Sequence, residues 1–105
     1  MARNVSMVSQ GFSLPNTGAM TIGTTAVKVS NSSRVLSTGV QIIADAGNAG
    51  DVYVGSRPNL TTEATAATSG VKLPASATIL YPAHLESDVY LIASEADQKV
   101  TFVSF

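Results

Sequence analysis

Short runs of alternating apolar and polar residues fill the chain from Thr21 to the C-terminus. Apolar side chains recur at every second position instead of at the wider spacing of a helix face, and this period of two is typical of half-buried β-strands. Clusters of Gly, Pro, Asn and Ser separate the runs. The pattern predicts an all-β domain, a small antiparallel β-sandwich or barrel of six to seven short strands. The connections are too short for the crossover helices of a parallel sheet.

The last two predicted strands carry apolar residues on both faces. One face of each carries Val89, Leu91, Ala93, Val100 and Phe102. The opposite faces carry Tyr90, Ile92, Val103 and Phe105. A half-solvated sheet would have polar residues on the opposite face. These strands are therefore either central in the sandwich or covered by another subunit, and the second group are candidate interface residues.

Two turns are expected to close β-hairpins. The polar loop 95–98 separates the last two strands and predicts the clearest hairpin of the chain. A glycine turn at 47–50 lies between a strand ending near Ile43 and one beginning near Val52, a spacing that also favours a hairpin. Both expectations place consecutive strands side by side in one sheet.

The N-terminal residues 1–18 are predicted to form an extended arm, and residues 19–105 a single β-sandwich domain. The arm is rich in small polar residues and ends in a Pro-Asn-Thr-Gly turn. It is either a frayed terminus or a segment that docks on a neighbouring subunit. In the second case its candidate interface residues are the apolar ones, Val5, Met7, Phe12 and Leu14.

Composition narrows the classes of partner. Charged residues make up 12% of the chain, about half the usual quarter, and the net charge is −1 with no basic stripe. Nucleic-acid binding is not expected, because it requires clustered Lys and Arg. No apolar run approaches the ~20 residues of a membrane span, so no membrane partner is expected. The absence of cysteine removes disulfides and thiolate chemistry. Because the N-terminal residues lack a signal-peptide pattern, synthesis in a cytoplasm is expected.

Residues able to do chemistry are scattered. His84 with Asp88 could belong to a Ser-His-Asp arrangement, but no G-x-S-x-G turn presents a serine. Loop carboxylates that could bind calcium lack a D-x-D-x-D-G spacing: Asp45, Asp51, Glu86 and Asp88. A glycosidase pair would be drawn from Glu63, Glu86 and Glu95. We expect no enzymatic activity, no catalytic or metal-binding residue and no cofactor, which leaves binding or assembly.

The triplet Asp-Val-Tyr occurs at 51–53 and again at 88–90, but the flanking residues do not match. We interpret the two copies as strand entrances, because a duplication should leave similarity over a whole structural unit. Tyr90 shares its face with Ile92, whereas Tyr53 is followed two residues later by a glycine. Tyr90 is therefore predicted to be buried or covered by a subunit, and Tyr53 to be more exposed.

The order of several short motifs resembles that of small β-sandwich virion structural proteins of tailed bacteriophages. The resemblance rests on a Val-Tyr-Val-Gly strand at 52–55, a glycine followed by a leucine three residues later at 70–73, Leu85 before Asp-Val-Tyr, and Ala96, Gln98 and Val100 near the end. It covers about residues 37–105. One departure is Ala75, where the pattern favours a glycine in the turn.

The resemblance implies a capsid decoration (cement) protein that docks on the major capsid protein or another virion protein and stabilises the lattice. A homo-oligomer, with a trimer favoured, and location in the virion after synthesis in the bacterial host cytoplasm follow from it. A protein associated with the tail or head fibre is the alternative within this class. A carbohydrate-binding module for host attachment is the alternative outside it, with Tyr53, Tyr81 or Tyr90 as stacking platforms.

Overall fold

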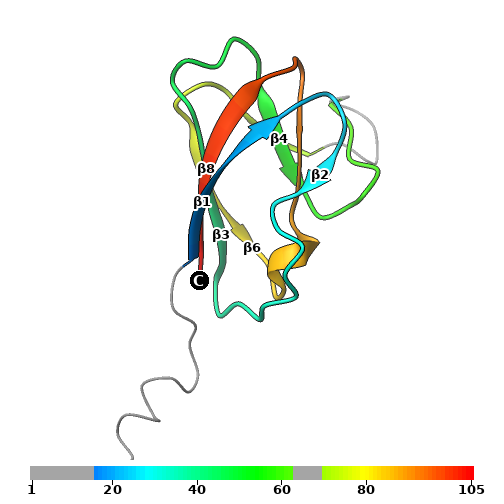
Figure 1. The fold of residues 1–105 in the computed structure, drawn as a ribbon, viewed down its shortest axis with the longest axis vertical. Coiled ribbons are helices and arrows are strands. Elements are labelled where there is room, and N and C mark those ends of the chain that lie inside the picture. Colours follow the sequence, from blue (N-terminus) through cyan, green and yellow to red (C-terminus); the bar gives the residue numbers. More distant parts are fainter. Residues whose placement is uncertain (1–15, 63–69) are drawn as a thin grey trace, which may run out of the picture.

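The computed structural model describes residues 16–62 and 70–105. These residues form two antiparallel four-stranded sheets that pack face to face as a small all-β sandwich (Figure 1). The predicted fold class is confirmed. The alternation of apolar and polar residues produces this fold because each sheet buries one face and turns the other outward.

The first sheet has the strand order β1-β8-β3-β6 and the second the order β2-β7-β4-β5. The strands of the first sheet are β1 (Asn16–Ile22), β8 (Gln98–Ser104), β3 (Gly39–Ala44) and β6 (Thr78–Pro82). Those of the second are β2 (Val27–Lys28), β7 (Tyr90–Ala93), β4 (Val52–Gly55) and β5 (Val71–Leu73). A short 3-10 turn, η1 (Glu86–Asp88), precedes β7.

The described residues contain eight strands where six to seven were expected. The unexpected strand is β1, and its first residues, 16–18, lie within the predicted arm. Its sequence, NTGAMTI, mixes polar and small residues with few apolar ones, so alternation is weak there. The rest of the predicted arm, residues 1–15, lies outside the described residues.

Neither predicted hairpin forms. β3 and β4 belong to different sheets, as do β7 and β8, so the chain crosses the sandwich at both turns. β4 and β5, by contrast, are consecutive and pair with each other. The alternation within each strand was interpreted correctly, but the period of two is the same whether a turn closes a hairpin or crosses between sheets.

Side-chain amides join the two crossing turns at one end of the sandwich. Asn48 forms two hydrogen bonds with the backbone of Lys99, donating from Nδ2 to the carbonyl and accepting at Oδ1 from the N–H. The buried side chain of Gln98 accepts from the N–H of Gly50 at 2.8 Å and donates to the carbonyl of Ala96. A Cβ at Gly50 would lie 2.6 Å from the Ser94 hydroxyl, so any other residue would displace this hydroxyl, which accepts a hydrogen bond from the N–H of Asp51. These contacts satisfy the buried polar groups of both turns.

The turn between β5 and β6 forms although Ala75 stands where a glycine was expected. The left-handed residue is instead Ser76, with φ of 69°. Its N–H donates to the carbonyl of Ala44, and the N–H of Ala77 donates to that of Pro74. The hydrogen bonds offset the cost of the left-handed conformation at a non-glycine residue.

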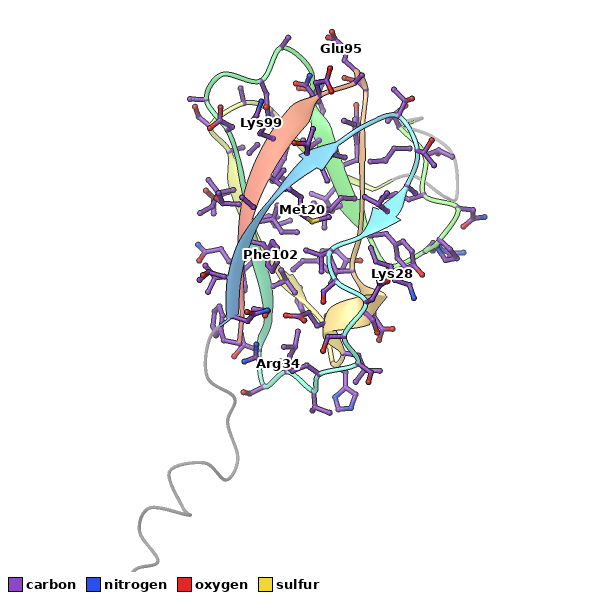
Figure 2. All side chains as sticks on the ribbon, viewed as in Figure 1. Met20, Lys28, Arg34, Glu95, Lys99 and Phe102 are labelled. Atoms are coloured by element: carbon purple, nitrogen blue, oxygen red, sulfur yellow. The ribbon has the colours of Figure 1, made fainter. Side chains whose placement is uncertain are left out.

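The core lies between the sheets and is built from aliphatic side chains of both. Ile42 and Val40 of β3 and Leu91 of β7 are inaccessible to solvent. Phe102 is the largest core side chain, and Met20 packs against the same cluster (Figure 2). On β7 and β8 the face that points inward carries Leu91, Ala93, Val100 and Phe102, which belong to this cluster together with Val89, the residue before β7. Burial of each such aliphatic side chain contributes about 1.5–3 kcal/mol.

Candidate interaction surfaces

The outer face of the first sheet is a broad surface of small and aliphatic residues. Strand registers place Thr17 opposite Val103, Ala19 opposite Thr101, and Thr101 opposite Ile43. We call this surface the threonine face and define it by Thr17, Ala19, Thr21, Lys99, Thr101, Val103, Gln41, Ile43, Thr78 and Leu80. Every one of these residues is exposed or half-buried, and Leu80 is 47% exposed. Lys99 is the charged residue of the set.

The threonine face is hollowed at the end that carries Lys99. A cavity of about 520 Å³ opens there, lined by Ala19 and Thr21 of β1, Thr101 of β8 and Ile43 of β3. Met20, Lys99 and Val100 also line it. A hollow of this kind can accept a protruding side chain or an extended segment of a partner.

A buried carboxylate holds the opposite end of the first sheet together. Glu86 of η1 is 1% exposed and accepts a short hydrogen bond from the Ser104 hydroxyl at the end of β8. It also accepts a hydrogen bond of 3.2 Å from the side-chain amide of Asn16, the first residue of β1. Arg34 lies 3.9 Å away and donates to Ser104 as well. Figure 2 shows Arg34 at the end of the sandwich where β1 begins.

The surroundings of Glu86 keep it ionised. Burial raises the pKa of this carboxyl. The hydrogen bonds from Ser104, Asn16 and Ser30 and the charge of Arg34 together lower the pKa by more than burial raises it, so the net pKa lies below its ordinary value. A buried charge that is paired and hydrogen-bonded is costly to disrupt. Glu86 therefore fixes where β1 and β8 lie beside each other.

The outer face of the second sheet has a different character. We call it the tyrosine face and define it by Lys28, Tyr90, Ile92, Tyr53 and Lys72. Tyr53 lies opposite Ile92, which places the two tyrosines diagonally on neighbouring strands. Lys72 forms an exposed ion pair of 3.4 Å with Asp51.

The predicted interface residues are distributed over both outer faces. Val103 and Phe105 are half-buried, and Val103 belongs to the threonine face. Tyr90 and Ile92 belong to the tyrosine face, where Ile92 is 7% exposed. Tyr90 and Tyr53 are both half-buried, so the predicted difference in their exposure is not observed within the chain. The remaining candidates, Val5, Met7, Phe12 and Leu14, lie outside the described residues.

The scattered residues considered for catalysis or metal binding do not converge. His84 and Asp88 are exposed, whereas Glu86 is buried in the network described above. Asp45 accepts a hydrogen bond from the N–H of Gly47 within its own turn. In the described part of the chain, no group of three or more His, Cys, Asp or Glu side chains is placed to hold a metal ion. Nor does any helix in these residues have the length and hydropathy to cross a membrane.

Sequence reasoning missed two features of the site. Glu86 was considered only as a calcium or catalytic carboxylate, and its partners lie up to 70 positions away in sequence. The part of the threonine face that β1 contributes, Thr17, Ala19 and Thr21, was missed because β1 was assigned in part to the arm. The available signal was the run of small residues without charge or proline at 16–22.

Comparisons with protein-family models, with curated proteins and with solved structures find no match to this chain.

Proposed function

We propose that the chain is a non-enzymatic structural protein of a tailed-phage virion, which decorates the capsid by docking its threonine face on the major capsid protein. The observation that carries the proposal is the composition of this face. Its residues are Thr, Ala, Val, Ile, Leu and one Gln, with a single lysine at one end. Interfaces are depleted of charge at their centre, and a surface of this kind costs little to desolvate.

Docking of many copies would stabilise the lattice by mass action. A protein that binds assembled capsid subunits and not dissociated ones shifts the equilibrium toward the shell. The sandwich suits this role because its core is independent of the threonine face, which stays available for contact. A homo-oligomer, for which a trimer was the sequence-based expectation, would multiply the contacts by raising the effective concentration of each docking face.

The experiment measures binding to capsids of the parent phage from which this protein has been stripped. Wild-type protein should rebind and raise the temperature at which the capsids break open. Thr101→Lys places a charge in the middle of the threonine face and should abolish rebinding while changing the free energy of unfolding by no more than about 0.5 kcal/mol.

Thr25→Lys is the matched control, because Thr25 is exposed outside the threonine face and the added charge is the same. It should rebind like wild type. Failure of the wild-type protein to rebind, or normal rebinding of Thr101→Lys, would contradict the proposal. A gene position beside a tail tube instead of a major capsid protein would favour the tail-associated alternative.

The tyrosine face favours a second candidate function, carbohydrate binding. Tyr53 and Tyr90 are diagonal neighbours with part of each side chain exposed, and Lys28 and Lys72 lie beside them. Tyr81 does not contribute, because it packs against the core cluster from β6. A glycan array should then show binding that Tyr53→Ala and Tyr90→Ala each remove. Binding unaffected by both changes would eliminate this candidate.

A further inference from the structure

The four edge strands of the sandwich are protected to different extents. β2 and β5 border the second sheet, and each is very short and carries a lysine, Lys28 or Lys72. β6 borders the first sheet and contains Pro82. Short length, lysine and proline are the usual devices that prevent an edge from pairing with another chain.

β1, the fourth edge, has none of these devices. It runs for seven residues, Asn16–Ile22, with no charged residue and no proline. It pairs with β8 along its whole length, and among the described residues no strand lies on its other side. In an antiparallel ladder every second residue directs its N–H and C=O away from the partner strand. β1 therefore presents a row of backbone groups that a further strand could bind.

The sequence of β1 is suited to pairing with itself. On the outer face of the sheet, β1 carries Thr17, Ala19 and Thr21. Ala19 is the middle residue of the strand. An antiparallel pair centred on Ala19 would align all seven residues and place Thr17 of each copy opposite Thr21 of the other. Cross-strand threonine pairs are favourable, and no like charges are brought together.

We propose that two copies of this chain associate through β1, antiparallel and around a two-fold axis at Ala19, so that their first sheets join into one continuous sheet. The Glu86 network supports this pairing, because it anchors Asn16 and so holds the start of β1 in the sheet. Once β1 of one copy pairs with β1 of the other, neither edge is left free, so association through this edge stops at a dimer. The inference does not depend on the proposed function, although the joined sheets would extend the threonine face across both copies.

Single cysteines test the register directly, since the chain contains none of its own. Ala19→Cys should form a covalent dimer on mild oxidation, because opposite positions bring the two Cβ atoms close enough for a disulfide. Thr21→Cys alone should not, because the two Thr21 positions would be separated by about 13 Å along the strands. A mixture of Thr17→Cys and Thr21→Cys should give the mixed dimer.

Sedimentation equilibrium on the full chain tests the edge without cysteines. Wild type should reach twice the monomer mass, and Ala19→Lys should raise the dissociation constant about tenfold or more, because two lysines would meet at the axis. Thr101→Lys is the matched control. It adds the same charge on the same face one strand inward, opposite Ala19, and should remain dimeric.

A wild-type monomer, a trimer that Ala19→Lys leaves intact, or equal cross-linking of Ala19→Cys and Thr21→Cys would each overturn the inference. The two proposals fail separately. Loss of the dimer in Thr101→Lys would overturn the edge pairing, whereas normal capsid binding of that variant would contradict only the proposed function. Far-ultraviolet circular dichroism of each variant should match that of wild type, since Ala19 and Thr101 are exposed.

Discussion

The two outer faces of the sandwich are built on the same alternating pattern but carry different residues. The inward-pointing side chains of both sheets fill one shared core, and Ile42 of the first sheet and Leu91 of the second are examples. Outside, the first sheet presents mainly threonine and aliphatic residues with one lysine, and the second presents two tyrosines flanked by lysines. The fold requires only that the inner residues be apolar. The outer residues are therefore the ones that can differ according to function.

The ends of the two sheets differ as well. The first sheet is anchored by the buried Glu86, which contacts β1 and β8 at once. The electrostatic pair of the second sheet, Lys72 with Asp51, lies on the surface, and the Lys72 side chain is 58% exposed. Charges inside and outside the protein contribute very differently to stability. The following changes test these contrasts.

The largest expected change in stability comes from comparing an inward-pointing with an outward-pointing residue of the same strand. Ile42→Ala should lower the free energy of unfolding by about 3–4 kcal/mol, because Ile42 is 0% exposed and its loss leaves a cavity. Ile43→Ala, one position along β3 on the half-buried threonine face, should cost no more than about 1 kcal/mol. Urea denaturation followed by circular dichroism measures both. Similar losses at the two positions would mean that the threonine face is part of the folding core.

Replacement of the buried carboxylate should have the next largest effect. Glu86→Gln should cost about 2–3 kcal/mol at neutral pH, since the amide cannot reproduce the charge-assisted hydrogen bonds with Ser104 and Asn16. Hydrogen exchange should show faster opening of β1 than of β4. Asp88→Asn in the same turn is the control, because Asp88 is exposed and its loss should be nearly neutral. An equal cost for both variants would remove the special role assigned to Glu86.

The pH dependence of stability should follow from the same residue. Because the folded pKa of Glu86 is depressed, its contribution is fully present above the unfolded pKa of about 4.3 and is lost as the pH falls through the lower folded value. Urea titrations at pH 7, 5, 4 and 3 should show wild type losing more stability than Glu86→Gln below about pH 5. Parallel curves for the two proteins would contradict the depressed pKa.

The smallest effect is expected at the surface pair. Lys72→Met removes the ion pair with Asp51 but leaves the aliphatic stem of the side chain, so stability should change by less than about 0.5 kcal/mol. The change should shrink further in 0.5 M salt, because exposed charges are screened. A loss as large as that of Glu86→Gln would mean that the two electrostatic sites do not differ as their burial indicates.

Alternation divided the residues of each strand into two faces because that information is local, but it did not decide which face of the last two strands points inward. Alternation groups Leu91 with Val89 and Ala93, and all three are buried. The prediction of two hairpins was wrong because a turn of the same length can either close a hairpin or cross between sheets. The candidate interface residues Val103 and Ile92 were predicted from strands with apolar residues on both faces, but the sequence could not assign them to different sheets.

What the chain determines locally is therefore the β class, the alternating faces and the positions of the turns. Only the tertiary structure decided which strands share a sheet, because pairing depends on contacts between residues far apart in the chain. Gln98 and Gly50 meet across 48 positions, and Glu86 and Asn16 across 70. A polar side chain that will be buried by such partners has the same local signature as one in solvent, since burial comes from the distant segments that close over it.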